Sequence, residues 1–116
     1  MLLFAVQLTA ANRKFTLVID AGHGGTDHGA PGAYSKEKDL TLKYALAFGK
    51  YVEDNCPDVR VIYTRKTDVF VTLAGRADIA NKANADLFLS FHINAVTGSR
   101  AARGFQSWTL GRGEHS

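Results

Sequence analysis

The sequence predicts an α/β fold, a three-layer sandwich built on a mainly parallel, twisted sheet. Two observations predict it. Short apolar runs rich in β-branched residues alternate with longer segments whose apolar residues recur at helical spacing. The first apolar run also ends in a glycine-rich turn that carries a histidine, which is where open α/β sheets bind their ligands. With 116 residues, 46% of them hydrophobic and 22% charged, the chain is expected to form one domain.

The first half of the chain predicts a strand, a long loop and a helix. Residues 15–20 form the strand, and residues 22–34 form a loop whose length and glycine content are typical of a binding loop. Asp39 is a suitable N-cap for the helix, which is expected to end near residue 54. One apolar stripe of this helix, widened by three neighbours, is expected to pack on the sheet: Leu40, Tyr44, Ala47, Phe48 and Tyr51, with Leu42, Leu46 and Val52.

The second half predicts strands over residues 59–64 and 87–92, with a helix between them. Thr72 can cap that helix over residues 73–83, and its inward side chains are expected to be Leu73, Ala77 and Ala80. The near-continuous apolarity of residues 87–92 favours a central parallel strand that is covered on both faces. A fourth strand is predicted over residues 104–110.

The first residues differ in character from the rest. Residues 1–13 begin with an apolar run that ends in small residues, so they are expected to be a signal-peptide remnant or a tail. This run is too short to span a bilayer, and no stable membrane insertion is expected. The remaining segment, residues 14–116, is expected to be the folded domain.

Composition excludes several functions. The net charge of +3 and the pI of about 9.2 come from scattered residues, and without a dense basic patch nucleic acid is a poor partner. The single cysteine, Cys56, excludes an internal disulfide and is expected to be a partly buried apolar residue. Arg65 and Arg76 are expected to pair with acidic groups inside the domain, and contact with a carboxylate-rich substrate is the alternative.

Three polar residues are expected to meet at one edge of the sheet. His23 follows the first predicted strand and His92 ends the third, and carboxyl ends of parallel strands share an edge. Glu37 lies just before the helix cap, and a right-handed crossover places that helix N-terminus at the same edge. Two histidines and a glutamate are a known ligand set for catalytic zinc, with water in the fourth position.

The residues alone leave alternatives at this site. The glycine loop equally fits a phosphate, although it lacks both common nucleotide-binding fingerprints. Asp27 and His28 are alternative ligands from the same loop, and Glu37 is flanked by lysines, as solvated carboxylates usually are. Asp20 is expected either to orient a ligand or simply to close the strand.

Several motifs together resemble one known family. They are Val-Ile-Asp-Ala-Gly-His-Gly-Gly at 18–25, Lys-Glu-Lys-Asp at 36–39, Tyr-Thr-Arg at 63–65, Leu73 with Arg76, Ile-Ala-Asn at 79–81, and Ala-Asp-Leu-Phe-Leu-Ser-Phe-His-Ile-Asn-Ala at 85–95. In this order they are similar to the catalytic domain of zinc-dependent N-acetylmuramoyl-L-alanine amidases, which are bacterial cell-wall hydrolases. The resemblance covers about residues 14–110.

The resemblance implies a function and a site. It implies that His23, Glu37 and His92 bind Zn²⁺, and that the enzyme hydrolyses the amide between N-acetylmuramic acid and L-alanine in peptidoglycan. It also implies an exported protein of the periplasm or cell envelope. The family's general-base glutamate is expected beyond Ser116, so the chain resembles the N-terminal two-thirds of the domain, and Glu114 is not assigned that role. A non-catalytic cell-wall binding or regulatory module is the alternative.

Overall fold

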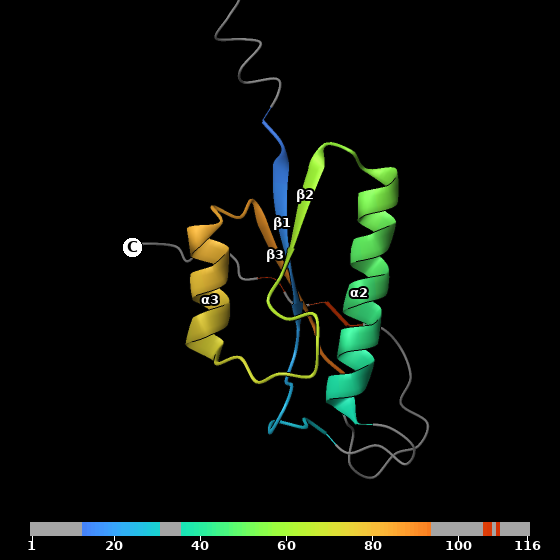
Figure 1. Cartoon of the computed structure of the whole chain (residues 1–116), viewed down its shortest axis with the longest axis vertical. Coiled ribbons are helices and arrows are strands. Elements are labelled where there is room, and N and C mark those ends of the chain that lie inside the picture. The colour runs from blue at the N-terminus through green and yellow to red at the C-terminus, as the bar shows by residue number, and fades with distance from the viewer. Residues whose placement is uncertain (1–12, 31–35, 94–105, 108, 110–116) are drawn as a thin grey trace, which may run out of the picture.

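The fold is α/β with a parallel sheet between two helices. The computed structural model describes residues 13–30, 36–93, 106, 107 and 109. Its elements follow in the order β1 (Phe15–Ala21), α2 (Glu37–Asn55), β2 (Val59–Tyr63), α3 (Leu73–Lys82) and β3 (Leu87–Phe91). β1 pairs in parallel with β2 on one side and with β3 on the other. The two helices flank the sheet on opposite sides (Figure 1), which confirms the predicted fold class.

Some predicted segments cannot be compared with this structure. Residues 1–12 of the signal-like segment predicted over residues 1–13 lie outside the described residues. The same holds for most of the strand predicted over residues 104–110, of which only residues 106, 107 and 109 are described, outside any strand. Within the described sheet β1 is the central strand and β3 pairs with it on one side. The segment predicted as the next strand lies almost wholly outside the described residues, so the central position of residues 87–92 stays a prediction.

The hydrophobic core lies between the sheet and α2. Alternate residues of β1, namely Leu17, Ile19 and Ala21, point to this side and are at most 5% exposed. They pack with Ala45 and Val52 of α2, and apolar residues of β2 and β3 surround them. Because neighbouring strand residues point to opposite faces, Val18 and Asp20 face α3 instead, and both are buried.

The buried stripe of α2 differs from the predicted one. Small residues face the sheet at Thr41, Ala45 and Gly49, whereas Tyr44 and Tyr51 are 50% and 65% exposed. The reason is distance. A Cβ atom at Gly49 would lie 1.9 Å from the hydroxyl of Tyr63, so α2 packs too close to the sheet for large side chains. Helical periodicity alone does not show which of two candidate stripes has room.

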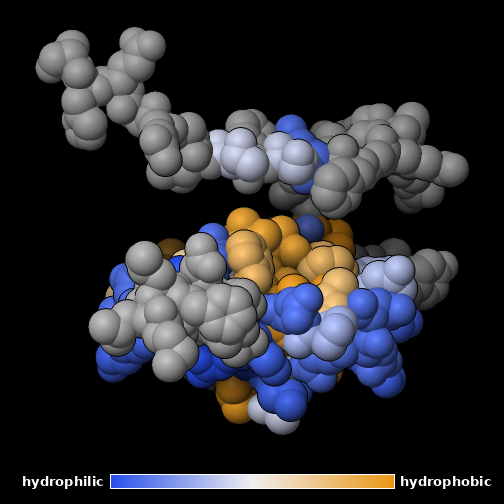
Figure 2. Space-filling view, turned by 90° about the horizontal axis from the view of Figure 1, so that it is seen from above, coloured by the Kyte–Doolittle hydropathy of each residue, from blue (hydrophilic) through white to orange (hydrophobic). Residues whose placement is uncertain are grey.

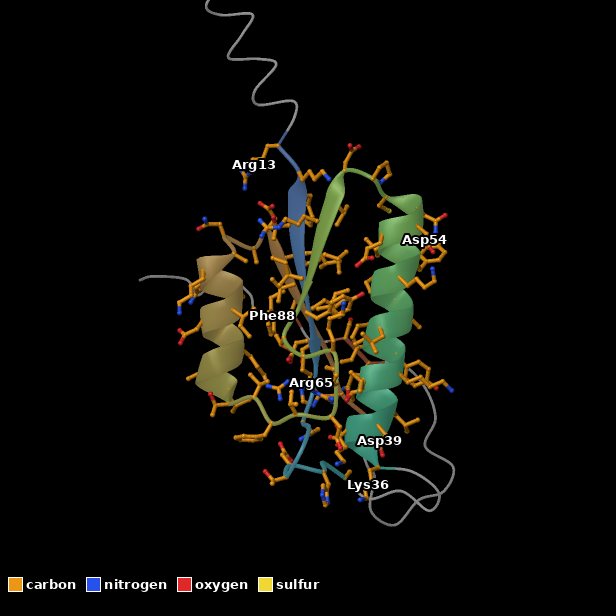
Figure 3. All side chains as sticks on the ribbon, viewed as in Figure 1. Arg13, Lys36, Asp39, Asp54, Arg65 and Phe88 are labelled. Atoms are coloured by element: carbon orange, nitrogen blue, oxygen red, sulfur yellow. The ribbon has the colours of Figure 1, made fainter. Side chains whose placement is uncertain are left out.

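The helix α3 covers the other face less completely. Thr72 caps it as predicted, because its side chain accepts a hydrogen bond from the Gly75 amide. Its inward residue, however, is Arg76, and the predicted inward Leu73 is 84% exposed. Phe88 of β3 lies on the α3 side of the sheet (Figure 3), in a hollow that also contacts Ala77 and Ala80. A buried ion pair therefore replaces an apolar contact beneath this helix.

The surface is divided between polar and apolar areas. Apolar side chains gather in the middle of the face seen in Figure 2, with polar side chains on both sides of them. Large apolar residues that remain exposed include Phe15, Leu87 and Phe88 at the sheet. Among the helices described here, none combines the length and the apolarity that a bilayer crossing needs.

Candidate metal centre

His23, Glu37 and His92 meet at the carboxyl edge of the sheet. His23 follows β1, Glu37 is the first residue of α2, and His92 follows β3. Glu37 Oε1 lies 3.1 Å from His23 Nε2 and 3.4 Å from His92 Nδ1. The imidazole rings meet edge to face, with centroids 5.1 Å apart. The convergence that parallel-sheet topology predicts for these three residues is therefore present.

The donor atoms fit a divalent metal ion. One donor atom from each residue can be chosen so that all three lie within 4.8 Å of one another. Tetrahedral zinc with bonds of about 2.0–2.2 Å holds its ligand atoms roughly 3.3–3.5 Å apart, close to the two separations from Glu37. A carboxylate and two imidazoles are also donors that zinc accepts. Within residues 13–30 and 36–93, His23, Glu37 and His92 are the group of possible ligands whose donor atoms lie this close together.

Backbone amides hold the Glu37 carboxylate in place. Its Oε2 accepts a hydrogen bond from the Ala30 amide, and its Oε1 accepts one from the Ile93 amide. Burial opposes ionisation, but these two bonds and the nearby histidines outweigh it and lower the pKa of Glu37. The Glu37 side chain is only 6% exposed. The Ala30 amide of the loop and the Ile93 amide after β3 therefore hold its carboxylate in the ionised form.

The helix α2 begins three residues earlier than predicted. Lys36 is the N-cap residue and makes no side-chain cap, so Asp39 lies in the first turn instead of capping it. The first helical amides are satisfied by the preceding loop: Glu37 donates to the Ala30 carbonyl and Lys38 to the His28 carbonyl. Because the loop supplies these acceptors, Glu37 enters the helix and its side chain turns toward the histidines.

Asp27 contacts His23 rather than joining the three donors. Asp27 Oδ2 lies 2.9 Å from His23 Nδ1, so Nδ1 can donate a proton to the carboxylate and Nε2 remains available as a ligand atom. The hydrogen bond from His23 lowers the pKa of Asp27, with a smaller effect from the Gly29 amide. His28, the other alternative from this loop, contributes its backbone carbonyl to α2 and is exposed.

A buried ion pair lies behind the histidines. Arg76 Nη1 lies 2.6 Å from Asp20 Oδ1, and both residues are at most 5% exposed. Thr64 donates to the same oxygen and Ser90 donates to Oδ2. Burial raises the pKa of Asp20, but the three side-chain donors together outweigh it and hold the pKa below its usual range. The prediction that Arg76 pairs with an acidic group inside the domain is confirmed.

Arg65 and Lys38 join the glycine loop to its neighbours. Arg65 donates to the carbonyls of Ala21, Gly22 and Lys38, so it links the end of β1 to the first turn of α2. Lys38 is 7% exposed and donates to Asp68 and to the Gly25 carbonyl. Sequence reasoning took the lysines beside Glu37 as a sign that this carboxylate is solvated. It did not find the contact between Lys38 and the exposed Asp68, which lies thirty positions away in the chain.

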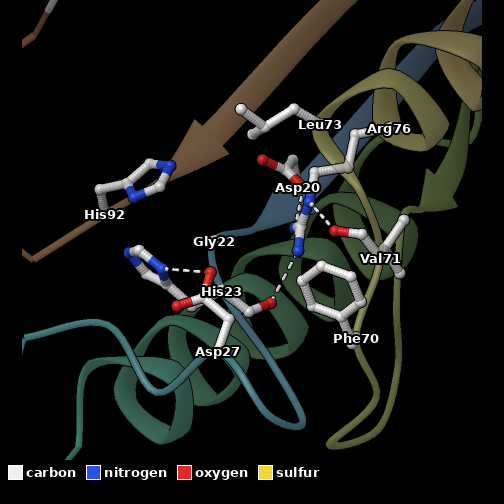
Figure 4. A pocket seen from close by; sticks show the side chains of 9 residues that line it. All are labelled: Asp20, Gly22, His23, Asp27, Phe70, Val71, Leu73, Arg76 and His92. Carbon is white, nitrogen blue, oxygen red and sulfur yellow. Dashed lines mark hydrogen bonds and ion pairs between the residues drawn. The ribbon is translucent and has the colours of Figure 1, made fainter.

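A hollow of about 320 Å³ opens beside the two histidines. Figure 4 shows both imidazoles on one side of it and an apolar wall from the segment before α3 on the other. The residues that line it are Asp20, Gly22, His23, Asp27, Phe70, Val71, Leu73, Arg76 and His92. A hollow with convergent polar groups and an apolar wall is a typical binding site for part of a larger substrate.

The sequence and the fold both match known cell-wall enzymes. Residues 17–116 match the family described as N-acetylmuramoyl-L-alanine amidase. The sporulation-specific N-acetylmuramoyl-L-alanine amidase of Bacillus subtilis is 40% identical over 92 residues, which are 79% of this chain and 34% of that protein. The endolysin of Bacillus phage SPP1 is 46% identical over 90 residues, covering 78% of this chain and 32% of the endolysin.

The fold is also similar to that of a solved amidase structure. The N-acetylmuramoyl-L-alanine amidase of Clostridium difficile 630 superposes with a TM-score of 0.74 and 34% identity, over 79% of this chain and 50% of that one. The chain spans about a third of the length of the two curated relatives, at 34% and 32%.

Proposed function

The chain belongs to the N-acetylmuramoyl-L-alanine amidase family, and from this premise we propose that it hydrolyses the amide between N-acetylmuramic acid and L-alanine in peptidoglycan. We further propose that the reaction depends on Zn²⁺, which His23, Glu37 and His92 would hold. Because peptidoglycan lies outside the cytoplasmic membrane, the proposal places the protein in the periplasm or cell envelope.

One observation carries the proposal. A buried, ionised carboxylate faces two imidazoles at 3.1 Å and 3.4 Å, at the edge of a parallel sheet where ligands bind. In the described part of the chain, Glu37 Oε2 accepts from the Ala30 amide, and Oε1 accepts from the Ile93 amide and faces both histidines. A divalent cation between them would balance the carboxylate charge and accept both imidazoles.

When bound, zinc supplies Lewis acidity that polarises a substrate carbonyl and acidifies a water molecule. The protein's own residues have other tasks. Asp27 accepts from His23 Nδ1 and so directs the lone pair of Nε2 inward. The apolar wall at Phe70, Val71 and Leu73 offers a surface to the methyl groups that flank the scissile amide.

We assign no general base among residues 13–93. Asp20 already accepts from Thr64, Ser90 and Arg76, and Asp27 accepts from His23 and Gly29, so neither is available to take a proton from water. The family resemblance assigns this role to a further glutamate on a later strand, and that assignment remains part of the proposal.

The test is direct. The protein is expressed from its complete gene, so that the later glutamate assigned as general base is included. It is loaded with zinc and incubated with purified peptidoglycan, and the newly exposed amino groups of L-alanine are labelled and counted. We expect them with the wild-type protein and not with Glu37→Ala. Sedimentation of the protein with peptidoglycan without new amino groups would support the binding-module alternative instead. Metal analysis of the protein purified without chelators should find about one zinc per chain, and its absence would contradict the metal site.

A further inference from the structure

The geometry points to Asp20 and Arg76 as a positioning pair that sets the two histidines at the candidate metal centre. Neither side chain is one of the three donors, and no step of the proposed reaction uses them. The inference rests on the proposed metal site. It assigns these two buried residues to the relative placement of His23, which follows β1, and His92, which follows β3.

Arg76 acts on His23 through the backbone. Its Nη2 donates to the His23 carbonyl at 2.7 Å (Figure 4). Its Nη1 donates to the Ala21 carbonyl, also at 2.7 Å. His23 has a φ of 64°, a left-handed conformation that costs a residue with a side chain about 1 kcal/mol or more. The guanidinium therefore stabilises the backbone turn that directs the imidazole toward Glu37.

Asp20 acts on His92 through its strand. Asp20 Oδ2 accepts from the Ser90 hydroxyl at 2.6 Å, and Ser90 lies in β3 two residues before His92, which follows this strand. Ser90 and His92 also line the same hollow beside α3. Since Asp20 also pairs with Arg76, one continuous chain of contacts joins the His23 carbonyl to the strand that carries His92. Because these contacts hold both histidines in place, metal binding has less conformational freedom of their side chains to remove.

A lysine cannot replace this arginine. The planar guanidinium reaches Asp20 and the carbonyls of Ala21, His23 and Val71 at the same time. A lysine ammonium is a single point on a flexible stem, so it can keep the ion pair with Asp20 or reach the His23 carbonyl, but not both in this geometry. Arg76→Lys therefore keeps the positive charge but no longer fixes the relative placement of His23 and His92.

The test measures metal affinity and metal geometry rather than activity. Cobalt(II) is titrated into the metal-free chain, because its visible absorption reports both its affinity and the symmetry of its ligands. We expect Arg76→Lys to lose about tenfold or more in affinity, as supporting residues of metal ligands typically do, with an altered spectrum. Val52→Ala in the core is the stability control, since it should lower the melting temperature and leave the cobalt spectrum unchanged.

Two milder variants keep the inference testable if Arg76→Lys fails to fold. Ser90→Ala and Thr64→Val each remove one hydroxyl that donates to Asp20, but only Ser90 lies on the strand of a histidine ligand. We expect a loss of affinity in Ser90→Ala and none in Thr64→Val. Equal affinities in all these variants would overturn the inference while leaving the metal site intact. A wild-type chain that binds no cobalt would overturn the metal site, and with it the positioning role.

Discussion

The carboxylate of Asp27 lies 2.9 Å from Nδ1 of His23, on the side of the imidazole opposite Glu37. The ring is thus held between two carboxylates, one exposed and one buried. In zinc proteins, a carboxylate behind a histidine ligand fixes the tautomer and orients the ring. Asp27 lies four positions after His23, and an isolated backbone bridge between Gly24 and Asp27 closes the turn that brings them together.

Removing that carboxylate should weaken metal binding. We expect Asp27→Ala to lower zinc affinity about 10- to 100-fold, because the His23 ring would lose its orientation and its preferred tautomer. Competition with a chromophoric chelator measures the affinity. Asp78→Ala, which removes an exposed carboxylate on α3, is the control for charge alone. Equal affinities of the two variants would show that Asp27 acts only through its charge.

Gly29 should not tolerate a side chain. Its φ is 69°, and a Cβ atom there would lie 2.7 Å from Glu37 Oε2 and 2.7 Å from His23 Cδ2. We expect Gly29→Ala to be destabilised by about 1–3 kcal/mol and to lose most of its zinc affinity, because two metal ligands must move. Denaturant unfolding and a zinc titration measure the two effects.

A second glycine provides the control. A Cβ atom at Gly49 would meet the Tyr63 ring beneath α2, away from the histidines. Gly49→Ala is therefore expected to cost about 1–3 kcal/mol through overpacking and to keep its zinc affinity. Loss of zinc affinity in both variants to the same extent would mean that general destabilisation, and not the contact with Glu37 and His23, explains the effect.

The sequence predicts the described elements well, and their ends apart from the start of α2, because strand and helix periods and the Thr72 cap are local signals. It also predicts the meeting of His23 and His92, since both follow parallel strands. It does not predict the buried stripe of α2, which depends on how closely that helix approaches Tyr63. Nor does it predict the position of Leu73, which is 84% exposed, whereas Arg76 is the buried residue of α3.

Long-range partners explain the remaining differences at the site. Asp20 could be predicted as a polar residue ending a buried strand, but its partners Thr64, Arg76 and Ser90 are 44, 56 and 70 positions away. The role of Asp27 beside His23 had a local signal, its spacing of four residues within a glycine loop. The helix start at Glu37 depends on carbonyls of the loop before it, which propensity alone does not report.

Acid should destabilise the fold partly through Asp20. The folded state lowers its pKa below the ordinary 3.8, so the unfolded chain binds more protons at low pH. Its stabilising contribution is therefore present above about pH 3.8 and is lost as the pH falls through the lower, folded-state pKa. Urea unfolding of the metal-free chain across this range should show stability falling with pH.

Variants isolate the part that belongs to Asp20. Thr64→Val removes a donor to its carboxylate, so the loss of stability on acidification should become smaller. Thr41→Val also removes a buried hydroxyl, but one that donates to the Gly22 carbonyl, so it should lower stability by a similar amount at every pH. A pH dependence that is identical in wild type and Thr64→Val would contradict the assignment to Asp20.

Zinc should stabilise the chain against heat. A ligand that binds only the folded state at 100 times its dissociation constant adds about 2.7 kcal/mol, which raises the melting temperature of a domain this size by roughly 10–20 °C. We expect this rise when zinc is added to the metal-free protein, and its reversal by a chelator. Magnesium, which prefers six oxygen ligands, should have little effect because two of the three donors are imidazoles. His92→Ala, which removes a half-exposed donor after the end of β3, should fold and lose the response to zinc. A zinc response of full size in His92→Ala, or an equal response of the wild-type protein to magnesium, would place the stabilising ion elsewhere.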